Sequence, residues 1–117
     1  MRILVSGLLL AIGFAATASA QTVSGIYSVA GTNADGTAYK GTAEITWNGT
    51  ACSISWQTGS SSAGTCLLTG KAFGASYQLG DATGIAVYEL QPDGTLKGQW
   101  TAVGTNGIGT ETLSPSK

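Results

Sequence analysis

The chain has 117 residues, five lysines and arginines against six aspartates and glutamates, and a formal net charge of −1. A chain of this size suits one domain with one modest core, and without a basic patch nucleic acid is not an expected partner. The sequence contains no histidine, which excludes Ser-His and Cys-His catalytic pairs and every zinc site that needs histidine.

Residues 1–20 predict a secretory signal peptide. Arg2 supplies a positive charge, residues 3–16 are almost continuously apolar, and Ala18-Ser19-Ala20 offers small residues for cleavage. We therefore expect an exported protein, periplasmic or secreted, whose single mature domain spans 21–117. A membrane anchor is the alternative reading, but the apolar run is short for a span and no basic stop-transfer cluster follows it.

The rest of the chain predicts about eight short strands and no helix. Apolar and polar residues alternate in short segments, and turns rich in Gly, Asn and Asp recur about every ten residues. The expected strands are 25–30, 37–47, 52–57, 64–69, 72–79, 84–90, 95–103 and 109–113.

The connections between these strands are all short, and this indicates antiparallel neighbours. Asp35-Gly36, Asn48-Gly49, Asp93-Gly94 and Asn106-Gly107 are typical of tight turns. A meander of eight strands most simply closes into an up-and-down barrel, which leaves no free edge. A six-stranded barrel and a sandwich remain alternatives. A small transmembrane barrel is a weaker one, because the second face of most strands is polar.

Cys52 and Cys66 are the only cysteines. They lie almost symmetrically about Gly59 in a Gly/Ser-rich turn, so a simple hairpin would place them face to face. In an exported chain this predicts a structural disulfide.

Carboxylates offer little sign of catalysis, and we expect no catalytic residues, no cofactor and no metal site. Glu89 and Glu111 are the two that share a strand face with apolar neighbours. Both are candidates for an inward polar residue near a barrel mouth. A pair of this kind could in principle serve a glycosidase, but strand ends with the carboxylates in water are the simpler interpretation.

Aromatic residues are expected mainly to fill the barrel, since eight strands leave little interior space. Tyr88 is treated as an exception. If Val87 belongs to the core, alternation places Tyr88 outside, where it becomes a candidate contact for a partner. Ser60 and Ser61 offer exposed hydroxyls in the turn between the cysteines.

Several motifs together resemble a loose family of small secreted bacterial proteins that are often labelled fibronectin-binding proteins. The residues that carry the resemblance are Gly25-Ile26-Tyr27, Gly31-x-Asn33-x-Asp35-Gly36-x-x-Tyr39-x-Gly41, Trp56, Asp93-Gly94-x-Leu96-x-Gly98-x-Trp100 and Gly109-Thr110-Glu111. The resemblance implies adhesion to a host matrix protein. Cys52 and Cys66 depart from the family pattern.

These observations favour a non-enzymatic exported binding protein whose partner is a protein or a small molecule. An adhesin-like role is the first expectation. The alternatives are an inhibitor of a hydrolase such as lysozyme and a carrier of a small ligand. The sequence does not identify the ligand or the oligomeric state.

Overall fold

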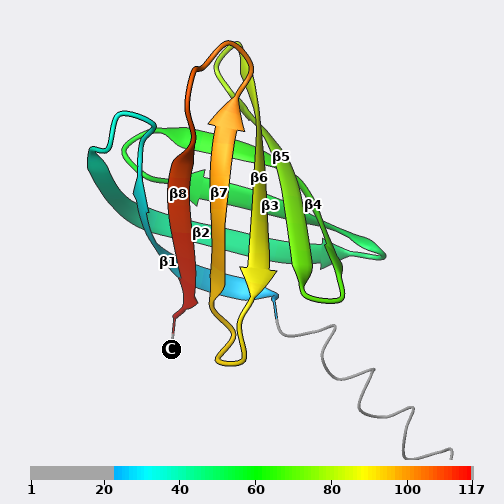
Figure 1. Ribbon diagram of the computed structural model, residues 1–117. Helices are drawn as coiled ribbons and strands as arrows, with labels where there is room; N and C mark the ends of the chain where they lie inside the picture. Colours follow the sequence, from blue (N-terminus) through cyan, green and yellow to red (C-terminus); the bar gives the residue numbers. More distant parts are fainter. Residues whose placement is uncertain (1–22, 117) are drawn as a thin grey trace, which may run out of the picture.

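A computed structural model describes residues 23–116, and the predicted signal peptide lies outside this range. The described chain forms a closed antiparallel barrel in which each strand pairs with the next and β8 returns to β1 (Figure 1). The prediction of an all-β, eight-stranded up-and-down barrel is confirmed. The strands are β1 (Gly25–Thr32), β2 (Ala38–Asn48), β3 (Ala51–Gln57), β4 (Ser61–Thr69), β5 (Ala72–Leu79), β6 (Ala82–Leu90), β7 (Leu96–Ala102) and β8 (Gly109–Pro115).

Glycines with positive φ form the tight turns between neighbouring strands. Leu79 pairs with Ala82, so Gly80 and Asp81 form a two-residue loop with Gly80 at φ +62°. The β2–β3 turn lies one residue later than Asn48-Gly49 predicts. Asn48 is still paired with Ala51, so the loop is Gly49-Thr50.

The two Asp-Gly-Thr segments build the same turn at opposite ends of the barrel. Asp35 Oδ1 accepts a hydrogen bond from the Thr37 backbone N–H at 3.0 Å, and Asp93 Oδ1 accepts one from Thr95 N–H at 3.0 Å. In both turns the glycine N–H donates to the carbonyl three residues earlier, that of Asn33 or of Gln91, at 2.9 Å. The similarity of the two segments is therefore one of turn chemistry.

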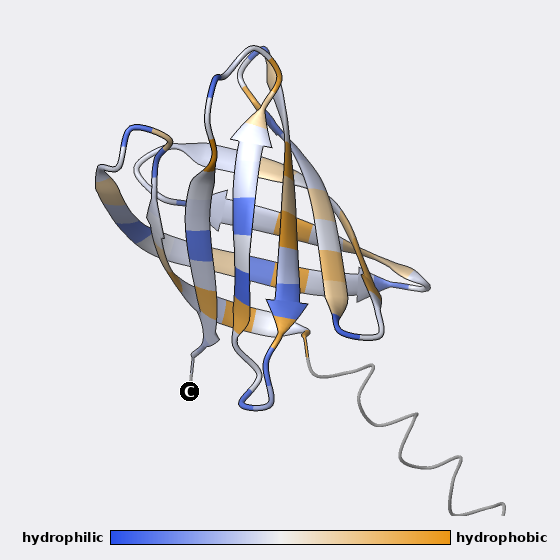
Figure 2. Cartoon of the chain, in the orientation of Figure 1, coloured by the Kyte–Doolittle hydropathy of each residue, from blue (hydrophilic) through white to orange (hydrophobic). Residues whose placement is uncertain are grey.

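Bands of different hydropathy alternate along most strands, as expected for a barrel with an inner and an outer face (Figure 2). On β6 the predicted assignment of faces is wrong. Ile85 and Val87 are each 56% exposed on the outside, whereas Ala86 and Tyr88 are buried inside. The inward positions of this strand hold Gly84, Ala86 and Tyr88, so its more apolar residues Ile85 and Val87 lie outside.

Apolar side chains fill the end of the barrel where β1 begins, which we call the closed end. The completely buried side chains there include Val23, Tyr27, Phe73, Leu96 and Leu113. The Tyr27 hydroxyl donates to the Val23 carbonyl at 2.5 Å, which fixes the segment before β1 against the core. Burial raises the pKa of Tyr27 to about 12, so it stays a neutral donor.

The predicted disulfide between Cys52 and Cys66 is present. The two residues are direct partners across β3 and β4, with Cα atoms 4.9 Å apart, and both are buried in the core. The hairpin register inferred from the sequence is therefore confirmed. β4 begins at Ser61, earlier than predicted, so the turn is shorter than the Gly/Ser-rich composition suggested.

Candidate functional site

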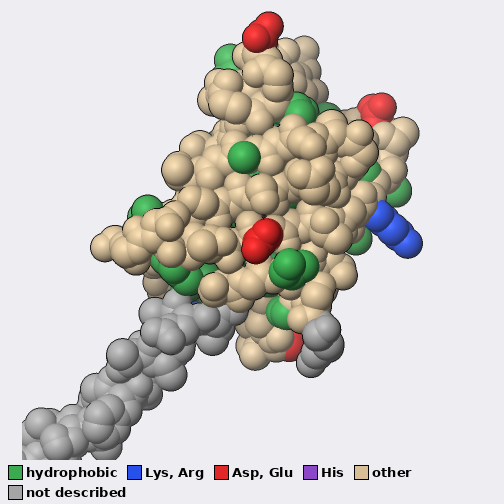
Figure 3. Space-filling model, turned by 180° about the vertical axis from the view of Figure 1, so that it is seen from behind, with side chains coloured by type: hydrophobic (Ala, Val, Ile, Leu, Met, Phe, Trp, Pro, Cys, Tyr) green, Lys and Arg blue, Asp and Glu red, His purple; other side chains and the backbone are tan. Residues whose placement is uncertain are grey.

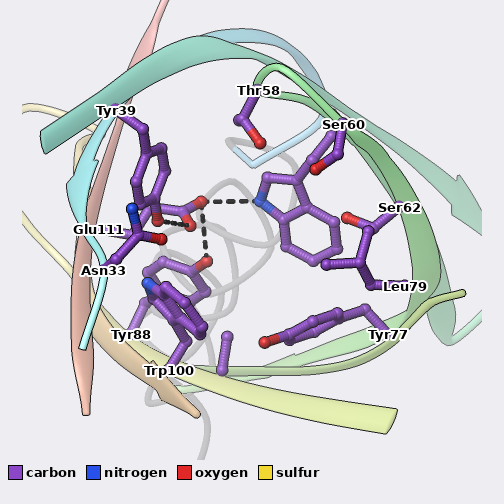
Figure 4. Close-up of a pocket in the computed structure, with 12 residues that line it drawn as sticks. Asn33, Tyr39, Thr58, Ser60, Ser62, Tyr77, Leu79, Tyr88, Trp100 and Glu111 are labelled. Carbon is purple, nitrogen blue, oxygen red and sulfur yellow. Dashed lines mark hydrogen bonds between the residues drawn. The ribbon is translucent and has the colours of Figure 1, made fainter. Parts of the chain in front are cut away.

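A cavity of about 160 Å³ occupies the other half of the barrel, which we call the open end. The β1–β2, β3–β4, β5–β6 and β7–β8 connections surround this end (Figure 1). Aromatic rings and one carboxylate form the walls, and short polar side chains from the loops form the mouth (Figure 4). The lining residues are Asn33, Tyr39, Trp56, Thr58, Ser60, Ser62, Tyr77, Leu79, Ala86, Tyr88, Trp100 and Glu111. The expectation that side chains fill the whole interior therefore holds only for the closed end.

Glu111 lies near the start of β8 and is the one buried charged residue in the described part of the chain. Its Oε1 accepts a hydrogen bond from the Tyr39 hydroxyl at 2.9 Å. Its Oε2 accepts two, from Trp56 Nε1 at 2.7 Å and from the Tyr88 hydroxyl at 3.2 Å. The three bonds, drawn in Figure 4, hold the carboxylate in one orientation toward the cavity.

Burial raises the pKa of Glu111, and hydrogen bonds from Tyr39, Trp56 and Tyr88 oppose that rise because they stabilise the charged form. The pKa of Tyr39 and that of Tyr88 are both raised, first by burial and then by the negative charge of Glu111. Both phenols therefore remain protonated donors. Three donors directed at one carboxyl group are the arrangement expected for an ionised carboxylate, which can only accept.

Glycine residues on neighbouring strands create the space for the aromatic walls. Four rings each lie against the glycine that is their direct cross-strand partner, and a β-carbon on that glycine would collide with the ring. The pairs are Tyr39 with Gly31, Tyr77 with Gly84, Tyr88 with Gly98, and Trp100 with Gly109. Rings that lie over glycine backbone stay close to the wall, so the centre of the barrel remains open.

Two edge-to-face contacts join rings within the wall. Tyr39 and Trp100 have centroids 6.3 Å apart, and Trp56 and Tyr77 have centroids 5.4 Å apart. The buried Nε1 of Trp100 makes no hydrogen bond of acceptable geometry within the described residues. It lies near enough to the Tyr39 hydroxyl to lower the pKa of that phenol, against the larger effects that raise it.

The residues singled out from the sequence fall in different places. Tyr88, expected outside, is only 4% exposed and contributes its hydroxyl to the cavity. Glu111 points inward, whereas Glu89 is exposed on the outer face of β6. The two glutamates therefore do not converge, and the paired carboxylates of a glycosidase are not formed.

The two serines also differ in position. Ser60 lines the mouth of the cavity and is exposed. Ser61 does not line the cavity, and its hydroxyl donates to the Gln57 side-chain oxygen at 2.8 Å on the exposed surface. In this hairpin, the hydroxyls that line the cavity belong to Thr58, Ser60 and Ser62.

The outer surface offers no comparably organised site on the face seen in Figure 3. On that face, backbone and side chains that are neither hydrophobic nor charged make up most of the surface, and the hydrophobic side chains form several small patches. Within residues 23–116, no group of three or more Cys, Asp or Glu side chains is placed to hold a metal ion. No helix in that range is long and apolar enough to cross a membrane.

For Tyr39, Trp56, Tyr77 and Trp100, sequence reasoning considered both a pocket lining and a filled core, and it preferred the filled core. The available signal was glycine at inward positions of the neighbouring strands, such as Gly84 and Gly109. In a closed barrel these glycines lie opposite rings. The register needed to see this comes only from the pairing of the strands.

No family model matches the chain. No curated protein matches it either. Several solved structures do, and the three described next are of low sequence identity. A redesigned β barrel superposes with a TM-score of 0.73 at 17% identity, covering 84% of this chain and 95% of the other. A mutant of the fluorescent protein UnaG superposes with a TM-score of 0.55 at 10% identity, and the match covers 84% of this chain and 99% of the other. A fatty acid transporter superposes with a TM-score of 0.53 at 15% identity, and the match covers 80% of this chain and 96% of the other. At such identities the likeness shows the fold alone.

Proposed function

We propose that this protein binds a small organic molecule in the cavity at the open end and acts as a carrier or scavenger. The observation that carries the proposal is the division of the barrel interior. The closed end is packed with apolar side chains, whereas the open end keeps a cavity whose walls combine rings with one oriented carboxylate. Such a combination of apolar wall and few fixed polar groups is typical of small-molecule sites.

The size of the cavity limits the ligand. A volume of about 160 Å³ is close to that of an engineered cavity that holds a single benzene ring. We therefore expect a ligand, or the buried part of one, no larger than about one substituted ring. The fatty-acid transporter among the similar folds supports a carrier role in general. A fatty acid entering head first would meet the Glu111 carboxylate, which disfavours that ligand here.

Binding of a host matrix protein, which the family resemblance implies, stays a prediction. The expectation that the protein is not an enzyme is retained in the proposal, because the cavity holds one carboxylate and lacks a second titrating group of suitable pKa beside it.

Three probes of different charge test the proposed function: phenol, octanoate and benzylamine. Trp56 and Trp100 line the cavity, so their fluorescence should report binding of at least one probe, with the affinity then measured by calorimetry. The variant Ser62→Phe, which fills the cavity from its wall, should weaken that binding at least about tenfold.

The matched control is Ala63→Phe, which adds the same ring at the next position on the exposed outer face. It should leave binding unchanged. Ala86→Leu provides a second cavity-filling variant if Ser62→Phe does not fold. If none of the three probes binds, or if filling the cavity leaves binding intact, the proposed function is wrong.

A further inference from the structure

The buried charge of Glu111 faces no opposite charge in the described part of the chain. Its three hydrogen-bond partners are neutral groups. Lys40, Lys71 and Lys97 are all exposed, and none lines the cavity. A carboxylate removed from water without a counter-ion is costly, and a cation that reaches it recovers part of that cost.

The rings around the carboxylate supply a second interaction that favours a cation. Tyr39 and Trp100 form one part of the wall, and Trp56 and Tyr77 form another. The faces of tyrosine and tryptophan attract organic cations, and the attraction is strongest where water is excluded. All four rings line the cavity with Glu111, and Figure 4 shows Tyr39, Tyr77 and Trp100 on different sides of it.

Among residues 23–116, the polar side chains that line the mouth do not repel a cation. They are neutral amides and hydroxyls, namely Asn33, Thr58, Ser60 and Ser62. Glu111 is the one carboxylate that lines the cavity, so a single positive charge balances the site.

We propose that the ligand is a compact organic monocation of the ammonium class, whose charged head lies among the rings and in front of Glu111. This inference rests on the proposed function and narrows it to one class of ligand.

A matched pair of probes separates charge from shape. Choline carries a quaternary ammonium group and a hydroxyl, and 3,3-dimethylbutan-1-ol replaces the charged nitrogen by carbon. Both are titrated into the protein with tryptophan fluorescence and calorimetry as readouts. Choline should bind at least about tenfold more tightly than the alcohol, as expected for a desolvated cation among aromatic rings.

Glu111→Gln removes the charge and keeps the shape. The amide oxygen can accept from Trp56 and Tyr88, and the amide nitrogen can donate to the Tyr39 hydroxyl, so the variant should fold. Its preference for choline over the alcohol should fall by about tenfold. Trp47→Phe is the control, because Trp47 lies toward the closed end and does not line the cavity.

The outcomes distinguish this inference from the proposed function. If the alcohol binds as tightly as choline, or if Glu111→Gln keeps the preference, the ligand class is wrong and the cavity remains a binding site. If choline and benzylamine do not bind while phenol or octanoate does, the result again overturns only the proposal that the ligand is a cation. If none of these probes binds, both proposals fail.

Discussion

Gly109 lies directly opposite Trp100 across β7 and β8, and the indole occupies the space that a β-carbon at position 109 would need. The carbonyl oxygen of Thr32 closes the same space from β1. Gly109 does not have a positive φ, so it is required by space and not by backbone conformation. The position of one cavity wall therefore depends on the absence of a side chain.

Gly109→Ala should destabilise the protein by about 1–3 kcal/mol, because the added methyl group meets both backbone and ring in a packed interior. Chemical denaturation measures this change. Gly74→Ala is the matched control, since Gly74 is a strand glycine with nothing within 4 Å of the β-carbon position. It should be neutral or slightly stabilising. An equal loss of unfolding free energy in the two variants would contradict the role assigned to Gly109.

The disulfide should contribute about 3 kcal/mol to the free energy of unfolding, as expected for closing a loop of about 15 residues. Replacing both Cys52 and Cys66 by alanine should remove that contribution, and a reducing agent should then have no further effect. Denaturation curves with and without dithiothreitol provide the test. A wild-type protein that is equally stable under both conditions would contradict the prediction.

Glu111 should make the wild-type protein less stable as the pH rises. Burial raises its folded-state pKa above the ordinary value of 4.5, so the folded state binds more protons than the unfolded state between these two values. The contribution of Glu111 to stability is then largest below about pH 4.5, and it falls as the pH rises through the raised pKa. Tyr39, Tyr77 and Tyr88 are the other titratable groups around this carboxylate, and they stay neutral in that range.

Glu111→Gln isolates this contribution. The difference in unfolding free energy between wild type and variant should change across the acid range. The wild type should become less stable relative to the variant as the pH rises. Denaturation at several pH values between 3 and 8 measures it. A constant difference, or one of opposite slope, would show that burial does not dominate at Glu111.

Asp93→Ala should lower the melting temperature at neutral pH, because it removes the hydrogen bond that the carboxylate accepts from Thr95 N–H. Hydrogen bonds from Thr95 lower the pKa of Asp93, so this stabilisation is present at neutral pH and is lost as the pH falls through the folded-state pKa. Thermal melts at pH 7 and below pH 3 should therefore differ in the size of the effect. Asp81→Ala, at a turn aspartate without such a bond, should have the smaller effect at pH 7.

Much of the fold could be read from local patterns. Alternation on 37–47 and the position of the cysteines about Gly59 were enough to predict strands, faces and the disulfide. These features depend on neighbours in sequence or on one hairpin. The inner face of β6 was misassigned because Ile85 and Val87 are more apolar than Gly84 and Ala86, and hydrophobicity alone carries no information on the room available.

The candidate site was harder to predict because it depends on contacts between distant residues. Glu111 meets Tyr39, Trp56 and Tyr88 from three other strands. Glu111 was one of two candidates for an inward glutamate, but its partners are fixed by the closure of the barrel between β1 and β8. Local sequence patterns do not predict the pairing of β1 with β8 that closes the barrel.

The two halves of the interior have separate consequences for the divergence of related sequences. The closed end, with Tyr27, Phe73 and Leu113 in its packing, must keep its shape for the chain to fold. Mouth residues such as Asn33, Ser60 and Leu79 are exposed and can change at little cost to folding. Descendants of such a barrel could therefore exchange one ligand for another while the fold persists. Their sequence similarity would be retained at the glycines and in the closed-end core.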